Sequence, residues 1–263
     1  MTEVRTRPLV LVIGGLDPSG AGIQADIETC FSLGAHALPI ASALTVQNTQ
    51  GLIRTVAIDP AMIREQIRTV AADVTPIAAC KIGMLPGREV ADAIAEALAV
   101  LSPSAPVILD PVLRSSSGGR LMGADLAQGL PEALMRRVSL VKPNVGEATE
   151  LCWLDRDGAP RWQAGQPRYM LVTGADTAAK STAVHRLFEA GELRLEIQQR
   201  LIPGRFHGTG CTLSSAIAAY CALGMDLVEA VRAGLAFTAD SVTCGYSIGG
   251  DQFMPDRRRS GTV

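Results

Sequence analysis

Two kinds of hydrophobic pattern alternate along the first two thirds of the chain. One consists of short, continuously apolar runs, which are typical of strands buried on both faces of a parallel sheet. These predicted strands are Leu9–Gly14, Leu38–Leu44, Ile77–Ile82, Val107–Leu109, Ser139–Val141 and Tyr169–Val172. In the other pattern apolar residues recur at helical spacing, in Ile23–Leu33, Ala61–Val74, Glu89–Leu101, Gly123–Arg136 and Val145–Cys152. This order predicts an α/β fold, with a central, mostly parallel β-sheet covered by helices on both faces.

The pattern changes in the last third of the chain. Ala183–Glu189 and Leu193–Gln198 flank Ala190-Gly191, which predicts a hairpin that adds a small antiparallel edge to the sheet. Two predicted helices follow, Thr209–Ala222 and Leu227–Thr243. No linker, repeat or low-complexity stretch interrupts these elements, so we expect residues 1–263 to form a single domain.

The chain ends in a polar segment, residues 251–263, which includes Arg257-Arg258-Arg259. We expect this segment to be a frayed or loosely packed tail. A basic contact site is the alternative interpretation of the three arginines.

The composition is that of a folded protein without a strongly charged surface. The 263 residues carry a formal net charge of −2, from 24 Lys+Arg and 26 Asp+Glu, and 48% of them are apolar. This excludes a disordered chain and argues against nucleic acid or an anionic membrane as the partner. No apolar run approaches the roughly 20 residues that cross a bilayer, and the first one is too short for a signal peptide. The six cysteines are scattered, which fits a reducing compartment, and we therefore expect a cytoplasmic protein.

Glycine is enriched, at 26 of 263 residues or about 10% against a usual ~7%, and it gathers at the ends of predicted strands. After the first strand, Gly20-x-Gly22-x-x-Ala25 superficially matches the dinucleotide-binding fingerprint. That fingerprint also needs a carboxylate about 20 residues later to hold a ribose, and residues 41–45 contain none. A dinucleotide-dependent oxidoreductase is therefore disfavoured.

Two further stretches have polar residues directly after predicted strands. Asp110 lies where it can act on a metal ion through water, although an Asp-Pro turn explains the local sequence equally well. Asn144 and Glu147 are three residues apart at a helix start, which is the pattern of a capping box. Considered alone, that segment is interpreted as a helix cap.

The last glycine-rich stretch, residues 207–214, opens a helix of small residues. Gly208 and Gly210 allow backbone N–H groups to converge, which makes this helix start an anion hole suited to a transferring phosphoryl group. Cys211 lies at the same helix start, where the positive end of the helix dipole favours a thiolate. Tight packing is the alternative explanation for the glycines. A Walker A loop is excluded, because G-x-x-x-x-G-K-[ST] does not occur in the chain.

Five motifs in this order carry a resemblance to a known family. They are Asp17–Asp26 (DPSGAGIQAD), Ala43–Thr49 (ALTVQNT), Lys81–Leu85 (KIGML), Asp110–Val112 (DPV) and His207–Thr212 (HGTGCT). Each is weak alone, but five in register are specific, and the similarity runs from about residue 9 to residue 224. The chain resembles the hydroxymethylpyrimidine/phosphomethylpyrimidine kinases of thiamine biosynthesis, within the ribokinase-like superfamily.

The resemblance implies a ribokinase-like fold and an activity. That activity is ATP-dependent phosphorylation of the hydroxymethyl group of 4-amino-5-hydroxymethyl-2-methylpyrimidine (HMP), followed by phosphorylation of the monophosphate. The residues implied for the pyrimidine pocket are Gly15, Asp26, Gln47 and Met84. The Gln47 amide can pair with a ring nitrogen and with the exocyclic amine, since it offers both a donor and an acceptor. The family is commonly dimeric, so the resemblance also implies a homodimer.

The remaining implied residues concern the phosphates and Mg²⁺. Asn144 and Glu147 match a superfamily motif near Mg²⁺ and the phosphates, and Glu147 and Asp110 are the implied metal-binding residues. The residues implied for catalysis are Gly208, Thr209 and Gly210, which hold the developing charge, and Cys211, which stands where most ribokinase-like enzymes have a catalytic Asp. Charge neutralisation and positioning supply most of the rate in such reactions.

Three departures from the family pattern are visible. The first glycine-rich loop is one residue shorter than usual, and the stretch from Leu154 to Arg168 is also shortened. The strand that normally ends in Val-Lys-Gly-Gly-His reads Val-Thr-Gly-Ala-Asp over residues 172–176. Thr173 and Gly174 are still expected at the phosphates, but the lysine that helps to hold them is absent. The absence of this lysine bears most on the second phosphorylation, because the substrate of that step is already anionic.

Two alternative functions remain open at this point. A pyridoxal or pyridoxine kinase is one, because the same scaffold accepts a similar hydroxymethylated ring. The other is a non-catalytic descendant that keeps the pyrimidine pocket, which the threonine at position 173 makes worth considering.

Overall fold

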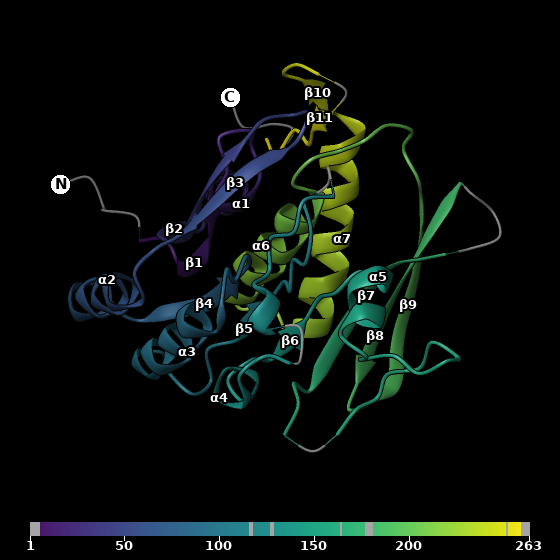
Figure 1. Ribbon diagram of the computed structural model, residues 1–263. Helices are drawn as coiled ribbons and strands as arrows, with labels where there is room; N and C mark the ends of the chain where they lie inside the picture. The colour runs from purple at the N-terminus through teal and green to yellow at the C-terminus, as the bar shows by residue number, and fades with distance from the viewer. Residues whose placement is uncertain are drawn as a thin grey trace.

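The protein is described by a computed structural model over residues 6–115, 118–126, 129–163, 165–176, 181–250 and 252–258. Its centre is a nine-stranded sheet in the order β3-β2-β1-β4-β5-β6-β7-β8-β9 (Figure 1). The strands are β1 (Leu9–Leu16), β2 (His36–Gln47), β3 (Leu52–Ala57), β4 (Ile77–Ile82), β5 (Val107–Leu109), β6 (Leu140–Val141), β7 (Tyr169–Asp176), β8 (Thr182–Glu189) and β9 (Glu192–Arg200). Strands β2, β1, β4, β5, β6 and β7 pair in parallel, whereas β3, β8 and β9 pair antiparallel.

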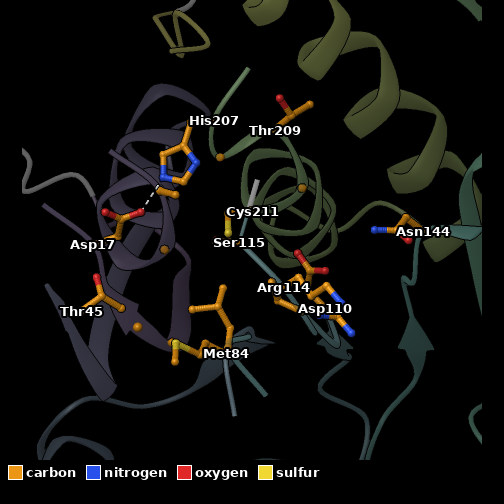
Figure 2. A pocket seen from close by; sticks show the side chains of 18 of the residues that line it. Asp17, Thr45, Met84, Asp110, Arg114, Ser115, Asn144, His207, Thr209 and Cys211 are labelled. Carbon is orange, nitrogen blue, oxygen red and sulfur yellow. Dashed lines mark hydrogen bonds and ion pairs between the residues drawn. The ribbon is translucent and has the colours of Figure 1, made fainter. Parts of the chain in front are cut away.

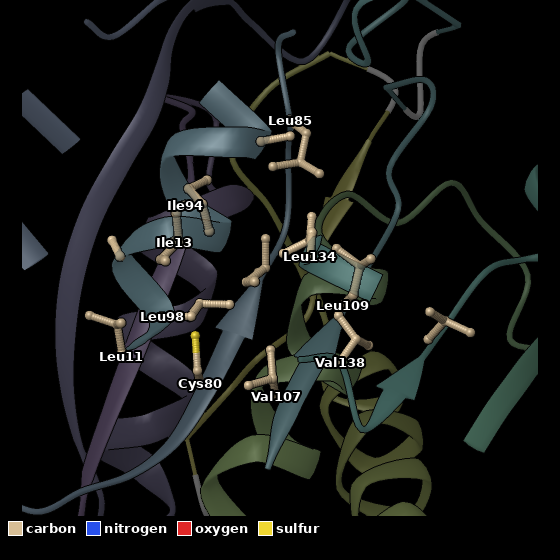
Figure 3. Close-up of a cluster of buried hydrophobic side chains, with 14 of the residues drawn as sticks. Leu11, Ile13, Cys80, Leu85, Ile94, Leu98, Val107, Leu109, Leu134 and Val138 are labelled. Carbon is tan, nitrogen blue, oxygen red and sulfur yellow. The ribbon is translucent and has the colours of Figure 1, made fainter. Parts of the chain in front are cut away.

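Helices cover both faces of the sheet. They are α1 (Gly22–Ser32), α2 (Pro60–Asp73), α3 (Arg88–Ala97), α4 (Glu132–Met135), α5 (Val145–Glu150), α6 (Thr209–Ala222) and α7 (Leu227–Thr243). One buried apolar cluster joins α2, α3 and α4 to the sheet face that carries Leu11 and Ile13. Figure 3 shows part of this cluster, including Ile94 of α3 and Leu134 of α4. A second cluster joins α1, α6 and α7 to the opposite face, which carries Val10 and Val12. Alternate residues of a single strand thus enter two cores, which explains why the central strands are apolar throughout.

The predicted fold class is confirmed: an α/β protein with a mostly parallel central sheet, helices on both faces and a small antiparallel edge. One predicted helix is wrong. Within residues 123–126 and 129–136 the structure has only a single 3₁₀ turn, Ala124–Leu126, and the four-residue α4. Gly129, with a φ of +133°, and Pro131 stand between these two pieces and interrupt the helical backbone. Residues 127 and 128 lie outside the described residues.

One strand of the nine-stranded sheet was not predicted. Strand β3 pairs only with β2 and forms the edge of the sheet, and its residue Ile53 is 77% exposed. Because its apolar residues are not buried, it lacks the continuous hydrophobic pattern that marks the central strands.

The expectation of a loosely packed C-terminal tail is wrong for residues 252–258. Phe253 and Met254 form strand β11 (Phe253–Met254), which pairs with β10 (Tyr246–Ser247). Gln252, Met254 and Arg257 are each less than 5% exposed. The three arginines suggested a solvated segment, but Arg257 is buried against loops far away in the sequence. Residues 251 and 259–263 lie outside the described residues.

Among the described residues, no helix has both the length and the apolar character that crossing a bilayer requires.

Candidate active site

A cavity of about 310 Å³ lies where the carboxyl ends of the parallel strands meet the start of α6 (Figure 2). This first cavity is lined from β1 and its loop, from β2, from the segments after β4, β5 and β6, and from residues 206–211. In Figure 2, Asp17 and His207 lie on the left and Asn144 on the right, with Cys211 and Asp110 between them. In open α/β sheets ligands bind at this edge, so the position agrees with the sequence expectation.

Asp17 and His207 form the centre of a polar network on one side of the first cavity. The His207 Nε2 and Asp17 Oδ2 atoms are 2.6 Å apart, and the Gln47 Nε2 donates to the same carboxylate oxygen over 3.2 Å. The backbone N–H and the hydroxyl of Ser19 donate to the other oxygen of Asp17. Burial would raise the pKa of Asp17, but the hydrogen bonds from His207 and Ser19 outweigh it and the pKa is lowered. The network therefore fixes an ionised carboxylate and holds the Gln47 side chain toward the cavity.

The start of α6 lies against the first glycine-rich loop, residues 17–22. Gly208 precedes α6 with a φ of +81°, a conformation that favours glycine. A Cβ atom on Gly208 would lie 3.2 Å from the Ala21 Cα, and one on Gly22 would lie 2.1 Å from the Gly15 carbonyl oxygen. Glycines thus allow the two backbones to approach each other and leave the N–H groups at the helix start facing the first cavity.

A buried ion pair lies behind the cavity wall. Lys81 and Asp26 are both fully buried, and the Lys81 Nζ lies 2.8 Å from Asp26 Oδ2. Asp26 Oδ1 accepts a hydrogen bond from the Ser215 hydroxyl over 2.6 Å. Burial would lower the pKa of Lys81, but Asp26 and other nearby anionic groups raise it above its ordinary value. Lys81 borders the cavity, whereas Asp26 does not. The position of Asp26 therefore gives no support to the predicted direct contact with a pyrimidine.

A second buried lysine, Lys142, directly follows β6 and lines the cavity. Its Nζ lies 3.0 Å from Asp110 Oδ1, and Asp110 Oδ2 accepts a hydrogen bond from the Ser214 hydroxyl over 3.1 Å. Burial would lower the pKa of Lys142, but the carboxylates of Asp110 and Glu147 raise it, so the side chain is an ammonium ion. A Cβ atom on Gly210 would lie 3.4 Å from this Nζ. Lys142 is therefore a cation held in place next to the glycine-rich start of α6.

Asn144 and Glu147 form the capping box of α5. Asn144 Oδ1 accepts from the Glu147 N–H, and Glu147 Oε2 accepts from the Asn144 N–H, both over 2.8 Å. The other carboxylate oxygen of Glu147 accepts from the Leu113 N–H over 3.3 Å. This confirms the capping interpretation. Both residues also line the first cavity, so capping holds them at the site.

The two carboxylates implied for Mg²⁺, those of Asp110 and Glu147, are close enough for the charge of one to act on the other. Burial and the charge of Asp110 raise the pKa of Glu147, although Lys142 and two backbone N–H groups oppose that rise. The described residues contain no group of three or more His, Cys, Asp or Glu side chains suited to a metal ion. Mg²⁺ usually binds one or two carboxylates together with water and substrate phosphates, and a dication would relieve the repulsion between this pair. Asp110 and Glu147 therefore fit Mg²⁺ that arrives with a phosphate ligand.

Cys211 lies in the first turn of α6 and borders the cavity. Burial raises the pKa of its thiol above the ordinary value of 9.0; Lys81 opposes this rise, whereas Asp26 and Asp110 add to it. The Gly22 N–H donates a hydrogen bond to the sulfur atom. Burial thus outweighs the helix dipole that led us to expect a thiolate, and the resting form is the thiol.

A second cavity, of about 520 Å³, adjoins the first. Thr173, Thr209, Gly210 and Lys142 line both cavities, and Gly174 lines the second one only. The buried Oγ1 of Thr209 has no hydrogen-bond partner within the part of the chain that the structure describes. The wall between the two cavities thus carries a lysine, an available hydroxyl and the start of a helix.

The structure brings most of the predicted site residues to the first cavity. Those that line it are Gly15, Gln47, Met84, Asp110, Asn144, Glu147, Thr173, Gly208, Thr209, Gly210 and Cys211. Gly174 lies in the second cavity, and Asp26 lies behind the wall.

Sequence reasoning did not assign Asp17, Lys81, Arg114, Lys142 or His207 to the site, although all five line the first cavity. For Lys81 a signal was available, since a lysine inside the apolar run 77–82 must be buried with a partner. Lys142 directly follows a buried strand, which is the same kind of signal.

Comparison with known proteins gives consistent matches. The family described as phosphomethylpyrimidine kinase matches residues 17–255. The hydroxymethylpyrimidine/phosphomethylpyrimidine kinase of Streptomyces coelicolor is 34% identical over 253 residues, which are 93% of this chain and 92% of that protein. Two longer bifunctional plant proteins of thiamine biosynthesis also match, and the chain spans 47% and 44% of their lengths.

Solved structures agree with the fold. A phosphomethylpyrimidine kinase from Clostridium difficile 630 is 28% identical, with a TM-score of 0.70, and the match covers 90% of this chain and 100% of that one. A pyridoxal kinase from Bacillus subtilis, solved as an ADP complex, is 24% identical, with a TM-score of 0.80 and coverage of 96% and 98%. The ribokinase-like fold that the resemblance implied is thus confirmed. With the family match over most of its length, the chain belongs to the phosphomethylpyrimidine kinase family of kinases.

Proposed function

We propose that this protein transfers the γ-phosphoryl group of ATP to the hydroxymethyl group of HMP. One observation carries the proposal: a cavity of about 310 Å³ is lined by Gln47 and Met84 as well as by the glycine-rich start of α6. Its volume lies at the lower end of the usual range for small-molecule sites, which suits a single substituted pyrimidine ring. The relative from Streptomyces coelicolor, which bears the same activity in its name, supports the proposal.

The pyrimidine is proposed to bind between Gly15, Gln47 and Met84. A Cβ atom on Gly15 would lie 2.8 Å from the Met84 Sδ, so the backbone and the thioether are already in close contact at this wall. The Gln47 amide donates to Asp17, and no described residue donates to its Oε1. That oxygen can therefore accept a hydrogen bond from the exocyclic amine of the ring.

ATP is proposed to lie in the second cavity, with its phosphates at the wall between the two. Thr209, Gly210 and Lys142 line both cavities, so the N–H groups at the start of α6, the Thr209 hydroxyl and the Lys142 ammonium are the groups proposed to hold the phosphates there. Asp110 and Glu147 are the residues that would hold Mg²⁺, which neutralises phosphate charge when it is bound. The Lys142 ammonium would also neutralise part of the phosphate charge. We propose Lys142 as the main lysine that holds phosphate in this protein.

Cys211 is proposed as the base that receives the proton of the HMP hydroxyl. Its sulfur lies at the first turn of α6, beside the proposed transfer path, and accepts a hydrogen bond from Gly22. Because the thiol is the resting form, this role requires deprotonation before or during transfer, which makes the rate depend on pH.

A pyridoxal kinase is the second candidate function, favoured by the fold similarity to the pyridoxal kinase from Bacillus subtilis. Steady-state kinetics with HMP and pyridoxal separates the two candidates. We expect a higher kcat/KM for HMP, and a higher value for pyridoxal would reverse the assignment. No turnover of either substrate, with HMP still raising the melting temperature, would favour a binding protein without activity.

The assembly and location are proposals as well. We propose a homodimer formed through the outer face of β1, β2 and β3, where Leu16, Leu44, Val46 and Val56 are each more than 40% exposed. Light scattering coupled to size-exclusion chromatography tests this, and a monomer at micromolar concentration would contradict it. The single-domain organisation and the cytoplasmic location remain predictions from the sequence.

A further inference from the structure

The C-terminal segment, residues 252–258, runs back to the two glycine-rich loops of the active site. The Phe253 N–H donates to the Arg205 carbonyl oxygen, and the His207 N–H donates to the Phe253 carbonyl oxygen, both over 2.8 Å. Met254 is 1% exposed, and a Cβ atom on Gly20 would lie 3.0 Å from its Sδ. The segment therefore contacts the first glycine-rich loop and the residues before α6 at the same time.

Arg257 is the residue of this segment that joins the most elements. Its side chain is 2% exposed. The Nε–H donates to the Thr212 Oγ1 over 2.9 Å, in the first turn of α6, and an Nη2–H donates to the Gly20 carbonyl oxygen over 3.0 Å. The Nη1 lies 2.7 Å from Glu28 Oε2 on α1. One planar group thus bonds to α1, to the first glycine-rich loop and to α6, which the rigid fork of a guanidinium suits.

These contacts lead directly to Gly208. The Thr212 hydroxyl that accepts from Arg257 donates in turn to the Gly208 carbonyl oxygen over 2.9 Å. A Cβ atom on Gly208 would lie 2.7 Å from the Arg257 Nη2. The guanidinium therefore supports the residue that shapes the anion hole, although Arg257 itself does not line the first cavity.

The charge of Arg257 is unusual for its position. A cation next to the N-terminus of a helix opposes the helix dipole. Its one carboxylate partner among the described residues, Glu28, has a side chain that is 38% exposed. The buried guanidinium therefore raises the free energy of the protein while the helix start is empty. It lowers the free energy of the complex once an anion occupies the helix start.

We propose that Arg257 is a positioning residue of the active site. It fixes the separation between the first glycine-rich loop and the start of α6, and its charge favours an anion at the N–H groups of residues 208–210. The identification of that anion as a transferring phosphoryl group rests on the proposed function. The effect of Arg257 on the two loops does not rest on the proposed function, because it can be measured in the protein without any ligand.

Amide hydrogen exchange of the free, full-length protein tests the effect on the loops. Arg257→Met removes the charge and all three hydrogen bonds but keeps a similar side-chain volume. Arg258→Met is the matched control, since it removes the same charge one residue later from a side chain that is 86% exposed. We expect exchange in residues 17–22 and 207–212 to become at least about tenfold faster in Arg257→Met and to stay unchanged in Arg258→Met. Unchanged exchange in both loops, or a uniform rise along the chain, would overturn the proposal.

Kinetics with HMP and ATP adds the second readout. We expect Arg257→Met to lower kcat by about 10²-fold, the scale of a displaced catalytic group, with KM for HMP nearly unchanged and part of kcat restored in Arg257→Lys. A variant that raises only KM, or a lysine variant as slow as the methionine one, would contradict a positioning role. If the unaltered protein phosphorylates neither HMP nor pyridoxal, the proposed function fails, and the exchange experiment still decides whether Arg257 holds the loops.

Discussion

The Nζ of Lys142 lies 3.0 Å from Oδ1 of Asp110, at the wall between the two cavities. Both side chains are less than 5% exposed, and Glu147 adds further negative charge beside them. A cation is therefore held at the boundary of the two cavities, where the proposed function requires phosphoryl transfer. The position in β7 that carries a lysine in the family pattern is Thr173 here, and Lys142 is the lysine that we propose holds phosphate in its place.

Lys142→Met should lower kcat by at least about 10²-fold, because it removes a preorganised cation from the transfer path. Lys142→Arg should retain more activity, since it keeps the charge. Methionine also leaves Asp110 without its ion-pair partner, and breaking a buried pair costs about 3–5 kcal/mol, so melting temperatures have to be measured in parallel. A folded Lys142→Met variant with normal kcat would show that Lys142 serves stability only.

Thr173→Lys should improve the second phosphorylation selectively. Thr173 lines both cavities, and among the described residues its Oγ1 makes only a long hydrogen bond of 3.4 Å, to the Pro143 carbonyl oxygen. A lysine at this position therefore loses little and adds a cation near the proposed phosphate site. The measurement is kcat/KM for HMP monophosphate relative to HMP. Thr173→Met is the control for side-chain size. An equal change for both substrates would mean that the missing lysine doesn't limit the second step.

The rate should rise with pH if the Cys211 thiolate is the base. Burial raises the pKa of this thiol above 9.0, so below that pH the thiolate fraction, and with it kcat, should grow about tenfold per pH unit. Cys211→Ala should lower kcat by about 10²-fold, the usual scale of general base catalysis, and abolish the slope. Cys211→Asp should give a flat profile above neutral pH, because a carboxylate is already ionised there. A slope that persists in Cys211→Ala would assign the titration to another group.

Asp17 should contribute stability that is lost in acid. Hydrogen bonds from His207 and Ser19 lower its pKa in the folded protein, so the ionised form stabilises the fold above about pH 4 and loses this effect as pH falls through the lowered pKa. The free energy of unfolding of Asp17→Asn, measured by urea denaturation, should therefore fall below that of the unaltered protein at neutral pH. The gap should narrow below about pH 4. A gap that is constant with pH would contradict a lowered pKa.

Much of the fold was predictable from the sequence because the central strands are buried on both faces. Val10 and Leu11 enter different cores, which makes β1 continuously apolar and easy to recognise. Strand β3 was not predictable in this way, since its side chains are largely exposed. The packed C-terminal segment was missed for the opposite reason, because its arginines suggested exposure. Arg257 is charged but buried, since it forms hydrogen bonds to α1, to α6 and to the loop at Gly20.

The candidate site was predictable where a motif has a backbone cause, as in the start of α6 at Gly208. It was less predictable where long side chains meet across the sheet edge. The contact of His207 with Asp17 joins residues 190 positions apart, and no local pattern indicates it. The expectation of a thiolate at Cys211 was wrong because burial has the largest effect on the pKa of this thiol. The sequence shows that Cys211 lies at a helix start but does not show that it is buried.

The most direct test of the account is the number of phosphates that this protein adds to HMP with excess Mg-ATP, measured by mass spectrometry of the product. The proposed function predicts a monophosphate at least, formed by the unaltered protein and formed about 10²-fold more slowly by Cys211→Ala and Lys142→Met. A diphosphate would mean that Lys142 and the start of α6 are sufficient without a lysine at position 173. If HMP binds and no phosphate is transferred, the central claim that this chain is an HMP kinase is contradicted.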